Sequence, residues 1–355
     1  MQEKPQKPAL SEALREETYQ LKAAWQRHDA SFLQKYLIED VEDPRINLQS
    51  ILTRHFLMDR LFDDRYAEIM AHEIYFALTV HWLLGLLKSK RSRAAVHMQT
   101  AAVLDALLAD GRDSDTAAIP PFMAEAFGTL SLPNYISELL MWVPREDDAE
   151  LMPGYLLETF GHIWAETLAH EQAEPISVIE PACGSANDYR YLAGYGLGPF
   201  LDYTGLDIAE KNIVNARRQF PEVNFQVGSV YEIPAEDKTI DFCFVHDLFE
   251  HLSPEGIDRA VAEICRVTTQ DVCLHFFNMD DIPQDAIRKK DGYHWNRLSS
   301  EHMQNRLDPR AVHLESRCLD TWLKSRFAYP DYHNKYAWSW WIQLQSSNPL
   351  DKIRS

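Results

Sequence analysis

Apolar residues recur at intervals of three and four through most of the first 150 residues, which is the spacing of helices that bury one face. In one segment these positions are Ile51, Leu52, Phe56, Met58, Leu61 and Phe62. The same spacing continues from Ile74 to Leu83, without a clear alternating strand pattern. We therefore predict an all-helical domain over residues 1–150. A charged stretch bounded by prolines, 144–153, predicts the linker to a second domain over residues 151–355.

The hydrophobic period changes after residue 175. An amphipathic helix pattern runs from Gly154 until Glu174-Pro175 ends it, and short apolar runs then alternate with helical segments. Strands are predicted at 176–179, 201–206, 223–227, 240–245 and 272–277, and a further helix and two more strands follow, the last at 336–344. Strands that alternate with helices indicate βαβ units and a sheet covered on both faces. We expect an α/β fold, a doubly wound, Rossmann-like, mostly parallel sheet of seven strands.

The composition agrees with a folded chain of more than one domain. Of the 355 residues, 46% are apolar and only 13 are glycine and 18 proline, so the chain can bury a sizeable core. The 54 acidic and 35 basic residues give a formal charge of −19. Because such a charge opposes the binding of phosphate groups, we expect no nucleic-acid partner, and a polyanion is the least favoured acceptor.

The cysteine pattern and the length of the apolar runs favour a cytoplasmic protein. Five cysteines show no CxxC spacing and fall in apolar runs, which is typical of reduced core thiols. The N-terminal stretch has no apolar segment typical of a secretion signal. The longest apolar run, Ile74–Leu87, has about 14 residues and falls short of the roughly 20 that a membrane span requires. We therefore expect no membrane span.

The first predicted strand ends in a turn of small residues, Glu180-Pro-Ala-Cys-Gly-Ser-Ala-Asn187, which leads into a helix. Such a turn lets backbone amides approach a ligand beyond the end of the strand. It retains only Gly184 and lacks the G-x-G-x-x-G pattern that binds a pyrophosphate. The carboxylate of Glu180 would repel a pyrophosphate and attract a cationic ligand such as a sulfonium.

Residues from about 154 to 346 resemble the class I S-adenosylmethionine-dependent methyltransferases, in particular the small-molecule group that includes the quinone-ring methyltransferases. The family's first motif, an acid followed by G-x-G-x-G, corresponds to residues 180–186, where alanine replaces two of the three glycines. Because alanine disfavours positive φ, we expect a slightly wider turn or αR and β backbone angles there. This departure leaves an altered chemistry or a lost activity open.

Three further motifs follow at the spacing of the family. Asp207 ends the second strand, and the resemblance implies that it accepts the ribose hydroxyls while Ile208 packs on the adenine. Ser229 follows the third strand in place of the family's usual acid. His246 ends the fourth strand, where the resemblance implies the methionine part of the cofactor. The resemblance thus implies S-adenosylmethionine as cofactor, held by Glu180, Ala182, Cys183, Gly184, Asp207, Ile208, Ser229, Val230 and His246.

Residues after the fifth strand are candidates for chemistry on the acceptor. A segment of about 17 residues, 281–297, should overhang the site as a lid, because ligands bind beyond the carboxyl ends of such strands. We expect Asn278, Tyr293 and Trp295 to bind the acceptor, with His294 or Asp247 as catalytic base. A surface loop that packs its rings on the core is an equally weighted alternative for this segment.

Histidine and acidic residues elsewhere favour a structural interpretation over a metal site. Asp247 and His251 have the i,i+4 spacing of a stabilising pair on a helix. The pair His72-Glu73 lacks the second histidine of H-E-x-x-H and predicts a pair on a helix surface. We expect no metal.

The sequence predicts an enzyme that transfers the methyl group of S-adenosylmethionine to an oxygen, nitrogen or carbon atom of a small-molecule acceptor, mainly by aligning the acceptor. One alternative is a non-methylating use of the cofactor, by 3-amino-3-carboxypropyl or aminopropyl transfer or by cyclisation. The other is a degenerate site in a binding or scaffold protein. We expect the helical domain to cover the acceptor site or to mediate homodimerisation.

Overall fold

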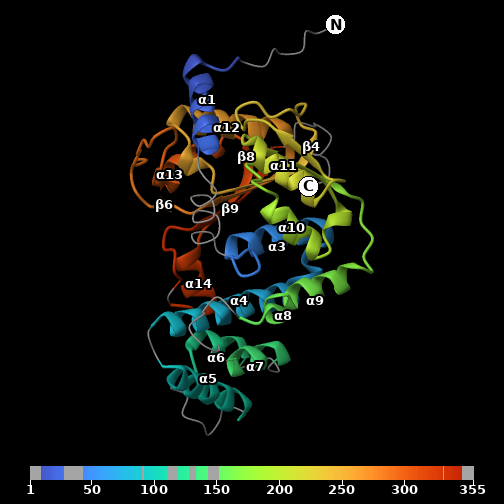
Figure 1. Cartoon of the computed structure of the whole chain (residues 1–355), viewed down its shortest axis with the longest axis vertical. Coiled ribbons are helices and arrows are strands. Elements are labelled where there is room, and N and C mark those ends of the chain that lie inside the picture. Colours follow the sequence, from blue (N-terminus) through green and yellow to red (C-terminus); the bar gives the residue numbers. More distant parts are fainter. Residues whose placement is uncertain are drawn as a thin grey trace.

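A seven-stranded sheet lies between layers of helices (Figure 1). In the order β3-β2-β1-β4-β5-β9-β8, its strands are Asn224–Val227, Leu201–Asp207, Ile176–Pro181, Ile240–His246, Thr268–Phe276, Trp338–Leu344 and Ala311–Cys318. The strands β1 to β5 pair in parallel, and β9 is antiparallel to both of its neighbours. The prediction of a doubly wound, mostly parallel sheet of seven strands is therefore confirmed.

The structure is a computed structural model, and it describes residues 9–27, 43–89, 92–109, 119–127, 133–142, 152–330 and 332–345. Its second sheet is a short parallel pair, β6 (Met279–Asp280) and β7 (Leu298–Ser299).

Helices cover both faces of the central sheet, and alternate strand residues face them. Val178 and Phe244 belong to one layer of buried side chains, whereas Ile179 and Val245 belong to the other, as the two-residue repeat of a strand requires. The first layer includes α3 (Leu48–Phe62), α9 (Thr159–Leu168), α10 (Asn187–Gly194) and α11 (Glu210–Gln219). The second includes α1 (Glu12–Arg27), α12 (Pro254–Val267) and α13 (Ser300–Leu307).

The remaining helices extend from one end of the sheet. They are α4 (Ala67–Lys88), α5 (Arg93–Leu108), α6 (Pro121–Phe127), α7 (Asn134–Met141), α8 (Gly154–Leu157) and α14 (Leu319–Phe327), with 3₁₀ turns η2 (Asp63–Tyr66) and η4 (Gly198–Phe200). Figure 1 shows α5, α6 and α7 at the end of the molecule opposite α1. The predicted helical character of the N-terminal part is confirmed for the residues that the structure describes.

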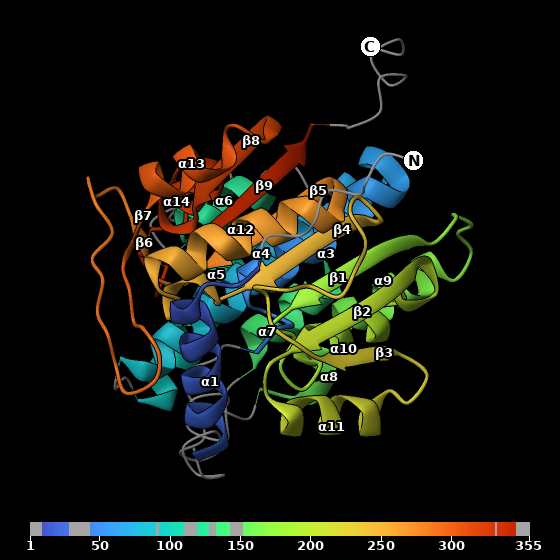
Figure 2. The same cartoon turned by 90° about the horizontal axis from the view of Figure 1, so that it is seen from above.

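Two helices from the first 150 residues are part of the layers on the sheet. Helix α3 packs against β5 and β9, and Leu14 and Leu21 of α1 are buried on the opposite face near α12 (Figure 2). Most of the predicted linker 144–153 lies outside the described residues. The division at residue 150 therefore stays a prediction, and the helices before it share buried contacts with the sheet after it.

One helical stretch, Leu48–Lys88, is long and apolar enough to cross a membrane if judged by length and composition alone. The mean hydropathy of its most apolar window is 1.3. More than half of its most apolar window, 56%, is buried inside the protein. A core helix of a soluble protein passes the same test, so this stretch is weak evidence for a span.

A buried ion cluster joins α3, α4 and α9. The carboxylate of Glu73 is fully buried and accepts hydrogen bonds from Arg54 at 2.7 Å, from His55 at 2.7 Å and from the Trp164 indole at 2.9 Å. The prediction that His72-Glu73 is a surface pair is wrong for Glu73. Its charge is compatible with burial because Arg54 supplies the opposite charge.

Candidate active site

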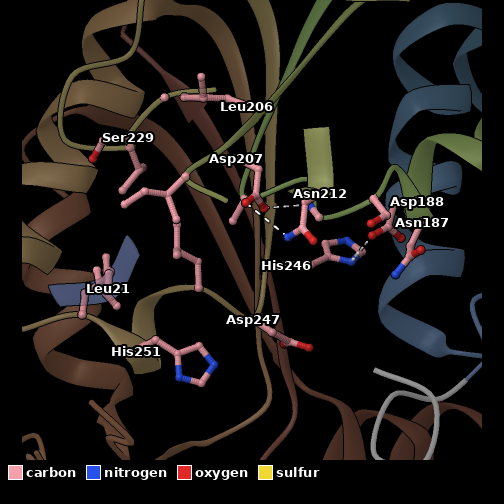
Figure 3. A pocket seen from close by; sticks show the side chains of 18 of the residues that line it. Leu21, Asn187, Asp188, Leu206, Asp207, Asn212, Ser229, His246, Asp247 and His251 are labelled. Atoms are coloured by element: carbon pink, nitrogen blue, oxygen red, sulfur yellow. Dashed lines mark hydrogen bonds and ion pairs between the residues drawn. The ribbon is translucent and has the colours of Figure 1, made fainter. Parts of the chain in front are cut away.

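The strand order reverses between β1 and β4, and a ligand in an open sheet of this kind binds beyond the carboxyl ends of the strands at that point. A cavity lies there (Figure 3). The segments that follow β1, β2, β3 and β4 line it, together with α1, α10 and the start of α3. Figure 3 shows Leu21 of α1 on the opposite side of the cavity from Asp188 of α10.

The turn after β1 adopts left-handed backbone angles at all three positions that correspond to the family's glycines. The φ values are +66° at Ala182, +55° at Gly184 and +68° at Ala186. The predicted αR or β angles at the alanines are therefore wrong, and the alternative of a slightly wider turn stays a prediction. A left-handed alanine costs roughly 1–2 kcal/mol because its Cβ crowds the following carbonyl oxygen. The surrounding fold imposes this conformation despite that cost.

Hydrogen bonds from the neighbouring strand fix the turn. The backbone N–H of Cys183 donates to the carbonyl oxygen of Leu206 at 3.1 Å, and the N–H of Gly184 donates to Oδ2 of Asp207 at 2.9 Å. A Cβ added to Gly184 would have no atom within 4 Å, so this glycine faces open space. The turn thus leaves room for a ligand at its closest approach.

The Asp207 carboxylate stands at the end of β2, only 8% exposed, and it lines the cavity. Its Oδ1 accepts the N–H of Ala209 at 2.7 Å and the side-chain amide of Asn212 at 3.3 Å (Figure 3). Burial raises the pKa of Asp207, and the N–H groups of Ala209 and Gly184 oppose that rise. The side chain therefore organises the turn and also presents a carboxylate to the cavity.

Glu180 and Cys183 do not line the cavity. Glu180 is buried, and the hydroxyl of Tyr203 donates a hydrogen bond to its Oε2. Burial, together with the nearby charge of Asp188, raises the pKa of Glu180 to about 8. The predicted cofactor contact of Glu180 therefore has no counterpart in the cavity wall, because its carboxyl points into the core. Cys183 is likewise buried within the turn.

The other predicted cofactor residues are all brought together at the cavity. The hydroxyl oxygen of Ser229 accepts a hydrogen bond from the backbone N–H of Tyr231 at 3.2 Å. Of the predicted cofactor residues, those that line the cavity are Ala182, Gly184, Asp207, Ile208, Ser229, Val230 and His246. Their contact with a cofactor stays a prediction.

Asp247 lines the cavity in a strained backbone conformation, with φ at +49°. Its Oδ1 is buried and has no hydrogen-bond partner in the part of the chain that the structure describes. Burial raises the pKa of Asp247 to about 6, although the charge of His246 lowers it. The predicted helical pair of Asp247 with His251 is wrong, because only a 3₁₀ turn, η5 (Phe249–His251), follows β4 and His251 contacts the carbonyl oxygen of His294 instead.

Three elements that sequence reasoning did not connect with the site complete its wall. The residues are Leu21 of α1, Pro44, Asn47, Gln49 and Ser50 around the start of α3, and Asn187 and Asp188 at the start of α10. Asp188 stands directly after the turn of small residues, and that position could have identified it. No local signal marks the α3 residues, because only tertiary packing carries them to the site.

The predicted lid folds against η5 and does not line the cavity. Within it, residues Ala286 and Lys289 bridge to Arg297 and His294. The N–H of His294 donates to the carbonyl oxygen of His251 at 3.1 Å.

The side chains predicted to act on the acceptor also lie beside η5 and outside the cavity wall. Tyr293 and Trp295 have ring contacts with His251 at centroid distances of 5.9 and 5.4 Å. Asn278 donates to the carbonyl oxygen of Asn296 at 2.8 Å. Asn278, Tyr293, His294 and Trp295 thus lie beside the site and outside its wall, and their roles stay predictions.

Within the described part of the chain, no group of three or more His, Cys, Asp or Glu side chains is arranged to hold a metal ion. The ring of His251 contacts the carbonyl oxygen of His294, and Asp247 lines the cavity with no such contact at its Oδ1 among the described residues.

Residues 178–271 match a family model described as a methyltransferase domain. This range begins in β1 and ends in β5, so it contains the turn, Asp207, His246 and Asp247. No match was found among curated proteins.

Several solved structures are similar over about half of the chain. A 1,6-didemethyltoxoflavin-N1-methyltransferase from Burkholderia thailandensis is 14% identical, with 53% of this chain and 77% of that one covered and a TM-score of 0.37. A methyltransferase from Methanosarcina mazei is also 14% identical, over 51% and 96% of the two chains, with a TM-score of 0.38. A phosphoethanolamine N-methyltransferase from Haemonchus contortus is 12% identical, over 53% and 52%, with a TM-score of 0.37.

These structural similarities are too low to carry an argument about the acceptor. Residues 178–271 thus form a methyltransferase domain, for which S-adenosylmethionine is the cofactor, and the turn and strand-end carboxylate of the doubly wound sheet lie at its cavity.

Proposed function

We propose that this enzyme methylates a small-molecule acceptor that binds between the turn after β1 and the start of helix α3. The observation that carries the proposal is the side chain of Asp247, which lines the cavity and whose buried Oδ1 has no hydrogen-bond partner among the described residues. A buried unpaired carboxylate oxygen is costly and is retained where a ligand supplies the missing partner.

The residues around the turn fit the cofactor. Gly184 faces open space, and the carboxylate of Asp207 beside it can accept hydroxyl groups. Ile208 and Val230 offer apolar contacts, and Ser229 offers a hydroxyl. When bound, S-adenosylmethionine supplies an electrophilic methyl group, and the protein has only to align the acceptor and exclude water.

Asp247 is the residue suited to remove a proton from a hydroxyl or amine acceptor. A general base works best when its pKa lies near the operating pH, and burial raises the pKa of Asp247 to about 6. His294 is less well placed, because its imidazole lies outside the cavity wall. A carbon acceptor would need the same alignment and the same removal of a proton.

The charge of the cavity favours a neutral or cationic acceptor. Asp188, Asp207 and Asp247 all line it, and no lysine or arginine does so among the described residues. A polyanionic acceptor would meet three carboxylates, with only the imidazole of His246 to compensate for them. An amine or a neutral hydroxyl compound fits this wall better.

Product analysis tests the proposal. Incubation with S-adenosylmethionine carrying a labelled methyl group and a panel of small amines and hydroxy compounds should yield a labelled acceptor together with S-adenosylhomocysteine. Release of methylthioadenosine would instead indicate transfer of another part of the cofactor. Calorimetry that detects no binding of S-adenosylhomocysteine would favour a binding or scaffold protein without this activity.

A further inference from the structure

One polar face of helix α3 contacts the carboxyl edge of the sheet, although α3 lies outside the matched methyltransferase domain. The amide of Gln49 donates to the carbonyl oxygens of Phe276 at 2.9 Å and of Trp338 at 3.0 Å. Ser50 and Thr53 lie one and four positions further along the helix and are buried as well. Three polar side chains of α3 are thus withdrawn from water, in addition to Arg54 and His55 of the Glu73 cluster.

Ser50 and Thr53 contact an acid–imidazole pair in the cavity wall. Oδ2 of Asp188 lies 3.3 Å from Nδ1 of His246, and both residues line the cavity (Figure 3). The hydroxyl of Ser50 donates to Oδ1 of Asp188 at 3.0 Å. Oγ1 of Thr53 lies 2.8 Å from Nε2 of His246. Each carboxylate oxygen and each ring nitrogen of the pair therefore has one partner.

The hydrogen bonds of Thr53 are all satisfied when His246 carries both ring protons. Oγ1 of Thr53 also lies 3.2 Å from the carbonyl oxygen of Gln49 and 2.7 Å from Nε2 of His275. The hydroxyl can donate to Gln49 while it accepts N–H bonds from His246 and from His275. Nδ1 of His275 is then free to accept from Ser339, at 2.8 Å. This assignment gives the Thr53 hydroxyl and both ring nitrogens of His246 and of His275 a partner each.

We propose that Ser50 and Thr53 are positioning residues, which hold the Asp188–His246 ion pair in one orientation on the cavity wall beside Asp247. The role of Asp247 in this statement rests on the proposed function, whereas the geometry of the pair does not.

The charges around His246 agree with an imidazolium ion. Asp188 on α10 is the main group that raises the pKa of His246, and Asp247 and Glu180 act in the same direction. Burial opposes them, and the ring of His275, 4.3 Å away on β5, stays neutral because burial holds its pKa well below the usual value. Arg54 on α3 acts on Asp188 and lowers the pKa of that carboxyl.

The ion pair in turn sets the acidity of Asp247. The charge of His246 lowers the pKa that burial has raised at Asp247. If Thr53 is lost, the charged ring loses an acceptor for Nε2–H. Hydrogen bonds to a charged group are roughly twice as strong as neutral ones, so the neutral ring becomes favoured. The pKa of His246 should then fall and that of Asp247 should rise.

Nuclear magnetic resonance of the imidazole groups tests this on the full chain, without an acceptor. The imidazole signal that is missing from the spectrum of His246→Gln is assigned to His246. In Thr53→Val, which keeps the shape of the side chain, the pKa of His246 should fall by about one unit, the size expected for one lost hydrogen bond. Thr79→Val is the matched control, because Thr79 is equally buried and donates to the carbonyl oxygen of Tyr75 in α4.

Activity provides the second measurement. In Thr53→Val the acidic limb of the profile of kcat/KM against pH should move to higher pH, and Ser50→Ala should shift it less, because it removes a bond to Asp188 only. Thr79→Val should leave the limb in place. An unchanged pKa of His246 in a folded Thr53→Val protein would overturn the positioning role. If no acceptor is methylated but the pKa does fall, only the proposed function fails.

Discussion

The carboxylate of Asp207 and the backbone N–H of Gly184 are joined by a hydrogen bond of 2.9 Å between the ends of two neighbouring strands. This bond fixes the turn after β1 before any ligand binds, while the carboxylate still lines the cavity. One side chain thus serves both the shape of the turn and the surface that the turn presents.

Replacing Asp207 should therefore weaken cofactor binding in two ways at once. We expect Asp207→Ala to reduce the affinity for S-adenosylhomocysteine by about 10- to 100-fold, since a hydrogen bond to a charged group contributes about 1.5–3 kcal/mol. Calorimetry measures this loss. Asp202→Ala is the control, because Asp202 is an exposed residue of the same strand. Equal affinities of the two variants would show that Asp207 does not contact the cofactor.

Glycine should relieve the strain at Ala182, where φ is +66°. We expect Ala182→Gly to raise the free energy of unfolding by about 1 kcal/mol, because the left-handed conformation no longer crowds a Cβ. At Ala186, which is 1% exposed, the gain should be nearly cancelled by the loss of a buried methyl group, worth about 0.8 kcal/mol.

Urea denaturation compares these variants with Ala193→Gly. Ala193 lies within α10, where glycine should destabilise the protein by about 1 kcal/mol. A loss of stability in Ala182→Gly similar to that in Ala193→Gly would contradict the left-handed conformation of the turn.

Removing the charge of Glu73 should destabilise the protein strongly. We expect Glu73→Gln to lower the free energy of unfolding by about 3–5 kcal/mol, because it leaves Arg54 buried without its counterion. Urea denaturation measures the effect, and Glu68→Gln, an exposed position on the same helix, is the control. A change of less than about 1 kcal/mol would mean that the cluster relaxes around the amide.

The same cluster has a defined pH dependence. Arg54 and His55 lower the pKa of Glu73 to about 2, below the ordinary value of 4.5 that applies in the unfolded chain. The stabilisation is therefore complete above pH 4.5 and decreases as the pH falls from there to about 2. Glu73→Gln should remove this part of the acid sensitivity, which denaturation series at several pH values can detect.

The sheet could be predicted from the sequence because each strand carries its own local signal. The apolar run of β4 and the turn after β1 are visible without any knowledge of tertiary contacts. The position of α3 could not be predicted, since Thr53 and His246 are separated by 193 positions in the sequence and meet only in the folded chain. The angles at Ala182 follow from bonds to the neighbouring strand, and these override the preference of the residue itself.

The two residues that the sequence suggested as a catalytic base differ in their position relative to the cavity. Asp247 has an unpartnered oxygen at the cavity, whereas His294 lies outside the cavity wall with its Nδ1 4.0 Å from Glu17 of α1. We expect Asp247→Asn to lower kcat by 10²- to 10⁴-fold for a hydroxyl or amine acceptor, the range that general base catalysis contributes. His294→Gln should retain most of the activity.

The pH profile separates a base from a merely structural carboxylate. Because the base acts in its deprotonated form, activity should rise as the pH increases through about 6, the pKa of Asp247, and this limb should be absent in Asp247→Asn. Binding of S-adenosylhomocysteine, measured in parallel, should change little in that variant. If His294→Gln loses the limb and Asp247→Asn keeps it, the hairpin of residues 286–297 must reach the acceptor, and the assignment of the base has to be reversed.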